Sequence, residues 1–210
     1  WQDDNWWYEE QGRKTSRRMC PPTMQNLSQG KLWITTQYDL KLPFLSTLHA
    51  QTMVITCKDG RVPAVDAACA QIGLNAPILF NIGYWNDSRD DHFWEIMQDV
   101  ADLLHAGIDV VVHCHAGCHR GALCAAIIRM FIEGRRFEEC KELLSQLRPR
   151  IEIDSIQYPQ LVYDKRKRKK KWTQTNDVWI REYERYALSD RNPFIEAPDA
   201  QLTRVSQSTS

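Results

Sequence analysis

The sequence has no long hydrophobic run and no excess of charge of either sign. No apolar stretch reaches the roughly 18–20 residues that a membrane-spanning helix needs, and 27 basic residues balance 27 acidic ones. This balance argues against a protein that binds nucleic acid over its whole surface. Hydrophobic residues make up 43% of the 210 residues, which is enough for one core of ordinary size.

Cysteine is present, but not in the pattern of a disulfide-bonded secreted domain. The chain has seven cysteines, an odd number, and it is not small enough to need disulfides for stability. No charged segment followed by an apolar one opens the sequence, as it would in a secretory signal. We therefore expect a reducing compartment, cytoplasmic or nuclear or both.

Strand and helix patterns alternate along the middle of the chain. β-branched and aromatic content predicts strands at residues 32–36, 53–56, 77–82 and 108–112. Helical spacing predicts helices at residues 40–48, 67–72, 90–105, 121–132, 137–147 and 158–163. Three consecutive valines at 110–112 are typical of a central parallel strand that is covered on both faces. The alternation predicts an α/β domain with a mainly parallel central sheet flanked by helices.

Composition divides the chain into four segments. Residues 1–29 show no period and are expected to form an N-terminal arm, and residues 30–164 form the compact domain. A run of seven basic residues, Lys165–Lys171, comes next, and residues 172–210 are expected to hold a helix and a disordered tail. The basic run is typical of a solvated linker, a nuclear-import signal, or a patch for an anionic partner such as RNA or lipid.

A loop rich in chemically active residues follows the valine strand. It lies where ligands of open α/β sheets bind, beyond the carboxyl end of a parallel strand. The helix after it directs unpaired N–H groups and the positive end of its dipole at the loop, which favours a phosphate dianion. The candidate phosphate-binding residues are His115, Ala116, Gly117, Cys118, His119 and Arg120.

The residue types in this loop suit nucleophilic attack on phosphorus. The helix N-terminus and the nearby cation favour a thiolate, which makes Cys114 the candidate nucleophile. Arg120 offers a planar fork of donors for two phosphate oxygens. Gly117 permits the positive φ that a tight anion-binding turn often needs. Because Cys-x5-Arg occurs by chance in many proteins, the preceding strand and the following helix carry as much weight as the motif.

The run His113-Cys-x-x-Gly-x-x-Arg120 resembles the signature of the cysteine-based protein phosphatases. The helix at 90–105 and the segment 154–161 are similar to the dual-specificity branch, so the resemblance covers about residues 30–164. It implies a phosphatase domain that acts on phosphotyrosine, and on phosphoserine or phosphothreonine, in a phosphoprotein substrate. It also implies a phosphocysteine intermediate on Cys114, no metal and no cofactor. In this family the residue at the position of His113 orders the loop.

Two positions depart from the family pattern. The family places Ser or Thr after the arginine, where the hydroxyl helps the thiolate to leave, but this chain has Gly121. Breakdown of the phosphoenzyme is therefore expected to be slow. The family also carries a general-acid Asp on the loop before the preceding helix. Asp87 is the candidate, with Asp90 and Asp91 as alternatives, and such an acid contributes about 10²–10⁴-fold to the rate.

Other functions stay open at this point. Gly121 also suits a catalytically impaired module that binds phosphate. The basic run suits a phosphatase for RNA 5′ ends or phosphoinositides. The spacings Cys114-x3-Cys118 and His115-x3-His119 could hold zinc. A structural zinc site normally takes two ligand pairs from separate segments, and the other cysteines show no such pair.

Overall fold

A five-stranded sheet forms the centre of the molecule, with the strand order β3-β4-β7-β5-β6. The computed structural model describes residues 8–10, 13–15, 22–57, 60–80, 91–148, 151, 160–164, 169–173 and 178–195. The strands are β3 (Thr23–Leu27), β4 (Gly30–Thr36), β5 (Met53–Thr56), β6 (Ile78–Leu79) and β7 (Val110–Cys114). β3 pairs antiparallel with β4, and every other pairing within this five-stranded sheet is parallel. The predicted α/β class with a mainly parallel sheet is confirmed.

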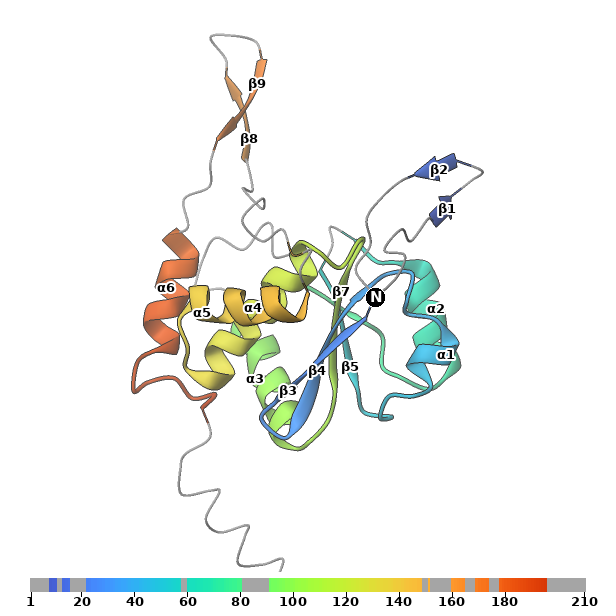
Figure 1. Ribbon diagram of the computed structural model, residues 1–210, viewed down its shortest axis with the longest axis horizontal. Helices are drawn as coiled ribbons and strands as arrows, with labels where there is room; N and C mark the ends of the chain where they lie inside the picture. The colour runs from blue at the N-terminus through green and yellow to red at the C-terminus, as the bar shows by residue number, and fades with distance from the viewer. Residues whose placement is uncertain are drawn as a thin grey trace, which may run out of the picture.

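Helices cover both faces of this sheet (Figure 1). On one side lie α1 (Leu42–Leu45) and α2 (Pro63–Gln71), and on the other lie α3 (Asp91–His105), α4 (Arg120–Glu133), α5 (Phe137–Leu147) and α6 (Val178–Ala187). Successive side chains of a strand point to opposite faces. Val110 and Val112 therefore pack in the core cluster with α3 and α4, whereas Val111 packs in the cluster with α1 and α2. This two-sided burial explains the run of valines.

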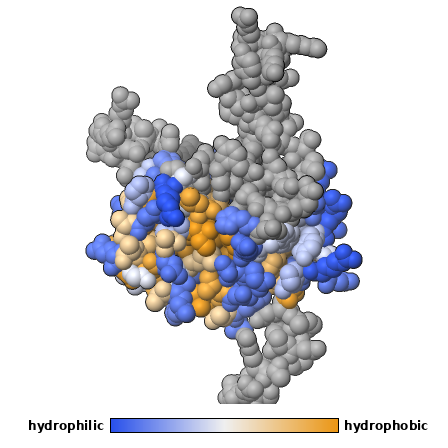
Figure 2. Space-filling model, turned by 180° about the vertical axis from the view of Figure 1, so that it is seen from behind, coloured by the Kyte–Doolittle hydropathy of each residue, from blue (hydrophilic) through white to orange (hydrophobic). Residues whose placement is uncertain are grey.

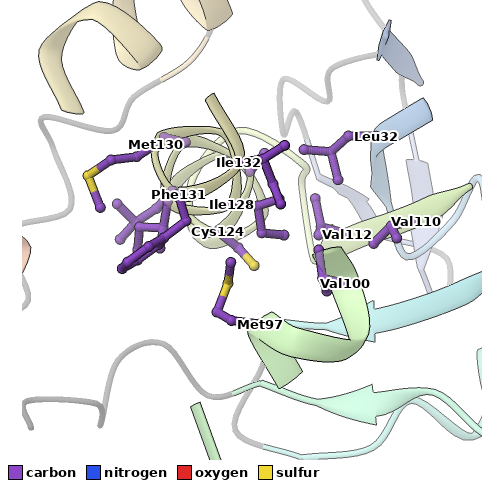
Figure 3. Packing of buried hydrophobic residues seen from close by; sticks show 14 of the residues in the cluster. Leu32, Met97, Val100, Val110, Val112, Cys124, Ile128, Met130, Phe131 and Ile132 are labelled. Carbon is purple, nitrogen blue, oxygen red and sulfur yellow. The ribbon is translucent and has the colours of Figure 1, made fainter. Parts of the chain in front are cut away.

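α4 is the most deeply buried helix of the described part of the chain. Eleven of its 14 residues are buried, because the sheet, α3, α5 and α6 surround it. Figure 3 shows Cys124 and Ile128 of α4 close to Met97 and Val100 of α3 and to the valines of β7. A helix packed on so many sides cannot shift without opening cavities. Its first residue, Arg120, is therefore held in a defined position relative to the end of β7.

The core continues beyond residue 164, where we expected the compact domain to end. Tyr183 of α6 stacks on Phe93 of α3, with ring centroids 4.4 Å apart and planes 9° apart. Phe194 is also buried and stacks on Trp94. The described residues 178–195 are therefore ordered against the core, past the point near Asp190 where disorder was expected. At the other end, β3 lies within the segment expected to be an arm.

One predicted helix is wrong. The segment expected to be helical at 158–163 contains β8 (Gln160–Asp164), which pairs antiparallel with β9 (Lys169–Thr173). Among residues 161–163, Val162 and Tyr163 are of types that favour strands. The apolar run is too short for its periodicity to distinguish a helix from a strand. A second small sheet pairs β1 (Tyr8–Glu10) with β2 (Arg13–Thr15). Of the basic run, residues 165–168 lie outside the described residues, and its role stays a prediction.

The surface of the described part mixes hydrophilic and hydrophobic residues. Figure 2, which views the molecule from behind Figure 1, shows hydrophobic residues gathered in the middle of that face with hydrophilic residues around them. No helix within the described ranges has the length and hydropathy to cross a membrane.

Candidate active site

The loop that follows β7 lies at the carboxyl edge of the sheet, beside the ends of β4 and β5. In the strand register Cys114 pairs with Thr36 of β4, and His113 pairs with Thr56 of β5. Cys114 is the last residue of β7, and α4 begins at Arg120, so five residues join the central strand to the helix. The first N–H groups of α4 have no partner within the helix. The predicted site residues 113–120 are thus placed on one loop between two rigid elements.

His113 is buried at the base of this loop. Its side chain is 0% exposed, and its Nε2 lies 2.7 Å from the hydroxyl oxygen of Thr56, within hydrogen-bonding distance. Its main-chain carbonyl accepts a hydrogen bond from the N–H of Cys57 at 2.8 Å. β5 therefore holds both the ring and the backbone of the residue before the candidate nucleophile. These contacts suit the predicted ordering role of His113, which stays a prediction.

Gly117 is the one position of the loop where only glycine fits. Its φ is +68°, a conformation that side chains rarely adopt. A Cβ atom there would lie 2.9 Å from Nη2 of Arg148 and 3.0 Å from the carbonyl oxygen of Thr35. The glycine predicted from the motif is therefore required both by backbone conformation and by close packing against two other elements.

Arg148 connects the loop to the sheet. It follows α5 and is 2% exposed. Its Nη2 donates to the carbonyl of Gly117 at 3.0 Å, and its Nη1 donates to the carbonyl of Ile34 at 2.9 Å and to the hydroxyl of Thr23 at 2.6 Å. A charged donor makes the stronger kind of hydrogen bond. One side chain thus holds the middle of the loop against β3 and β4.

Gly121 lies directly against the candidate nucleophile. A Cβ at this position would be 3.6 Å from Sγ of Cys114 and 3.4 Å from its backbone nitrogen, which are ordinary contact distances. A serine side chain therefore fits here and would bring its hydroxyl close to the sulfur. The departure from the family pattern at this position thus lies at the point where a hydroxyl could interact with the sulfur of Cys114.

Two other thiols, those of Cys57 and Cys124, lie behind the loop. Burial raises the pKa of Cys57 well above its usual value, and a hydrogen bond with Cys124 raises it further, while the positive charge of Arg120 acts in the opposite direction. Cys57 is therefore a neutral thiol at physiological pH and does not compete as a nucleophile.

The outer side of the loop contacts the turn after β4. The hydroxyl oxygen of Tyr38 lies 3.3 Å from both ring nitrogens of His115, and the two rings meet edge to face. The carboxylate of Asp39 accepts hydrogen bonds from the N–H and the hydroxyl of Thr36, which closes this turn. Cys118 donates its thiol proton to the carbonyl of Ala116 at 3.2 Å. The loop is thus restrained from outside as well as from below.

Some predicted site residues are not placed. Asp87, the candidate general acid, and its alternative Asp90 lie outside the described residues, and Asp91 is described only as the first residue of α3. His119 occupies the position before α4. Within the described part of the chain, no three His, Cys, Asp or Glu side chains come together as ligands for a metal ion. The Cys and His residues of the loop therefore do not form the ligand set of the zinc alternative.

Two residues that support the site were not predicted from the sequence. Arg148 ends an amphipathic helix, where a basic residue is usually explained by the helix dipole. Tyr38 lies in a turn between two predicted elements. Their neighbours in the sequence gave little indication of a role. Pro149 follows Arg148 and Asp39 follows Tyr38, and neither indicates a contact with residues 113–120.

Known structures with this arrangement are dual-specificity phosphatases and related proteins. Human DUSP28 aligns with a TM-score of 0.52 at 13% identity, over 80% of this chain and 97% of that one. Human tyrosine phosphatase-like serine/threonine/tyrosine-interacting protein aligns with a TM-score of 0.52 at 16% identity, over 78% and 94%. A mouse putative dual specificity phosphatase, complexed with zinc tungstate, aligns with a TM-score of 0.52 at 14% identity, over 87% and 97%.

The chain therefore has the fold of the dual-specificity phosphatases, which confirms the predicted resemblance at the level of structure. No family model and no curated protein matches the sequence. At identities of 13–16% these similarities define the fold alone. What the protein does must be argued from its own loop.

Proposed function

We propose that this protein is a cysteine-dependent phosphatase that hydrolyses phosphotyrosine, and also phosphoserine and phosphothreonine, in proteins. One observation carries the proposal. Cys114 ends the central strand, and Arg120 begins a buried 14-residue helix six residues later, in the fold of the dual-specificity phosphatases. The loop therefore brings together a nucleophile, a cation that can bind two phosphate oxygens, and the positive end of a helix.

In the proposed first step, Sγ of Cys114 attacks phosphorus and the bond from phosphorus to the leaving oxygen breaks. Asp87 is proposed to protonate that oxygen. Arg120 and the amides of the loop hold the equatorial oxygens, whose charge is spread in the transition state. In the second step water attacks phosphorus of the phosphocysteine and the S–P bond breaks. Inorganic phosphate is released and the Cys114 thiolate is regenerated.

A second candidate is a phosphate-binding module with little turnover. It is favoured by Gly121, which carries no hydroxyl. A Cβ added at this position would lie 3.6 Å from Sγ of Cys114. Such a module would form the phosphocysteine, or bind phosphate, without releasing it efficiently. The two candidates share the loop and differ in whether the phosphoryl group is transferred to water and released.

Intact-mass analysis of the protein after brief mixing with p-nitrophenyl phosphate tests the proposed chemistry. We expect one phosphoryl group to be added and peptide mapping to place it on Cys114, together with release of one equivalent of p-nitrophenol in a burst. Steady release after the burst supports the phosphatase, and a burst without further release supports the module. The absence of both adduct and burst would contradict the phosphatase and would limit the module to binding phosphate without reacting with it.

Replacing Gly121 with serine is expected to raise the steady-state rate without changing the burst rate. The new hydroxyl can donate a hydrogen bond to the departing sulfur, and hydrogen bonds to charged groups are worth about 1.5–3 kcal/mol, or roughly 10- to 100-fold in rate. Gly121→Ala is the matched control, because its Cβ fits equally well but offers no donor. Equal acceleration by both variants, or none by Gly121→Ser, would contradict the assigned defect.

A further inference from the structure

A pocket lies beside the loop, between the turn after β4 and helix α2. Its volume is about 520 Å³, within the usual range of about 300–1,000 Å³ for pockets that bind small molecules. Tyr38, Leu40 and Lys41 line it from the turn, and Val62 and Ala68 line it from the α2 side. The pocket is separate from the loop that we assigned to phosphate binding, and that assignment gives it no role.

Two contacts connect the lining of this pocket to the candidate active site. The N–H of Gln37, another lining residue, donates to the carbonyl of Cys114 at 2.9 Å. Tyr38 contacts the ring of His115, the residue after the nucleophile. Two residues of the pocket lining therefore contact Cys114 and His115, which places the pocket next to the candidate active site.

The lining of the pocket defines what it can bind. Leu40, Val62 and Ala68 provide apolar walls, and among the described lining residues only Lys41 has a formal charge. Lys41 is exposed, so it lies at the rim rather than in the interior. Apolar walls favour an apolar group by removing it from water, and the rim cation favours a neighbouring carboxylate. A membrane surface is instead attracted by clusters of four to eight basic residues, which this pocket lacks.

We propose that this pocket is a substrate subsite that takes an apolar side chain next to the phosphorylated residue of a peptide, with an acidic residue preferred beside it. The proposal rests on the proposed phosphatase function and specifies its substrate. It makes Ala68 and the other wall residues determinants of specificity, while the chemical step stays with the loop.

The test compares two phosphotyrosine peptides that differ only in whether leucine or glycine follows the phosphotyrosine, and p-nitrophenyl phosphate as a substrate without flanking residues. For the wild type we expect kcat/KM to favour the leucine peptide by about 10-fold or more, the usual discrimination of an apolar pocket. Ala68→Phe fills the pocket and should reduce this ratio towards one. Ala70→Phe, on the exposed side of the same helix, is the matched control and should keep the ratio.

Lys41→Met should remove a preference for an acidic residue beside the leucine while the leucine preference persists. If Ala68→Phe fails to fold, as judged by its thermal transition, Ala64→Phe fills the pocket from an exposed lining position.

The outcomes separate this inference from the proposed function. Wild-type hydrolysis of p-nitrophenyl phosphate with equal rates on both peptides, or an unchanged ratio in a folded Ala68→Phe, would overturn the subsite. Absence of hydrolysis of all three substrates would overturn the phosphatase itself. Faster hydrolysis of a phosphoinositide in vesicles than of either peptide, lost in Ala68→Phe, would assign the pocket to a lipid and contradict the peptide proposal.

Discussion

Replacing Cys114 with serine is expected to lower kcat/KM for p-nitrophenyl phosphate by about 10⁴–10⁶-fold, the usual scale for loss of a catalytic nucleophile. The change exchanges one atom at the end of β7, in a position that is 3% exposed. A serine hydroxyl is not ionised at neutral pH and is a much weaker nucleophile than a thiolate. Attack on phosphorus should therefore fail while the loop and helix α4 stay in place.

The control for this prediction is a cysteine outside the loop. Cys140 of α5 is buried, and burial together with the nearby Glu133 raises its pKa to about 12, so it is a neutral thiol throughout the working range of pH. Cys140→Ala should hydrolyse the substrate at a rate comparable to that of the wild type. Activity in Cys114→Ser close to that of Cys140→Ala would assign the chemistry to another residue.

Replacing Arg148 with methionine is expected to lower the free energy of unfolding by about 3 kcal/mol or more and to reduce activity as well. Methionine keeps much of the apolar stem but leaves the carbonyls of Gly117 and Ile34 and the hydroxyl of Thr23 without this donor. Buried acceptors that lose their partners cost about 1–3 kcal/mol each. In a chain of 210 residues, each kcal/mol corresponds to about 2–4 °C in Tm.

This prediction has a stability arm and an activity arm. Thermal or chemical denaturation measures the first, and the size of the phosphoryl burst measures the second, because the loop should hold phosphate less well without its anchor at Gly117. Arg61→Met is the control. The side chain of Arg61 is 55% exposed and its ion pair with Asp66 is 3.6 Å long, so its removal should change stability by about 0.5 kcal/mol or less. A folded Arg148→Met as stable as Arg61→Met would contradict the anchoring role.

The elements around the site were predictable because each has a strong local pattern. The three valines before the loop require burial on both sides, and β7 is covered by helices on both faces. Residues 90–105 carry an unbroken helical period, and α3 occupies almost the same range. By contrast, residues 158–163 are too few for periodicity to separate helix from strand, and the strand β8 was missed.

The candidate site was predictable only in its local part. The nucleophile, the arginine and the glycine lie within eight residues, so the chain itself sets their spacing. The conformation of Gly117 also agrees with its prediction, since a positive φ is a local property. Asp87 was inferred from the family pattern, and because it lies outside the described residues, its role as the acid stays a prediction.

By itself, the sequence determined that the chain is an α/β protein and predicted a phosphate-directed loop between a buried strand and a helix, because periodicity and short-range spacing are written along the chain. Only the tertiary structure decided what supports that loop. Arg148 meets Gly117 across 31 residues, His113 meets Thr56 across 57, and Tyr38 meets His115 across 77. Contacts at such separations depend on strand order, register and helix packing, which no local pattern specifies.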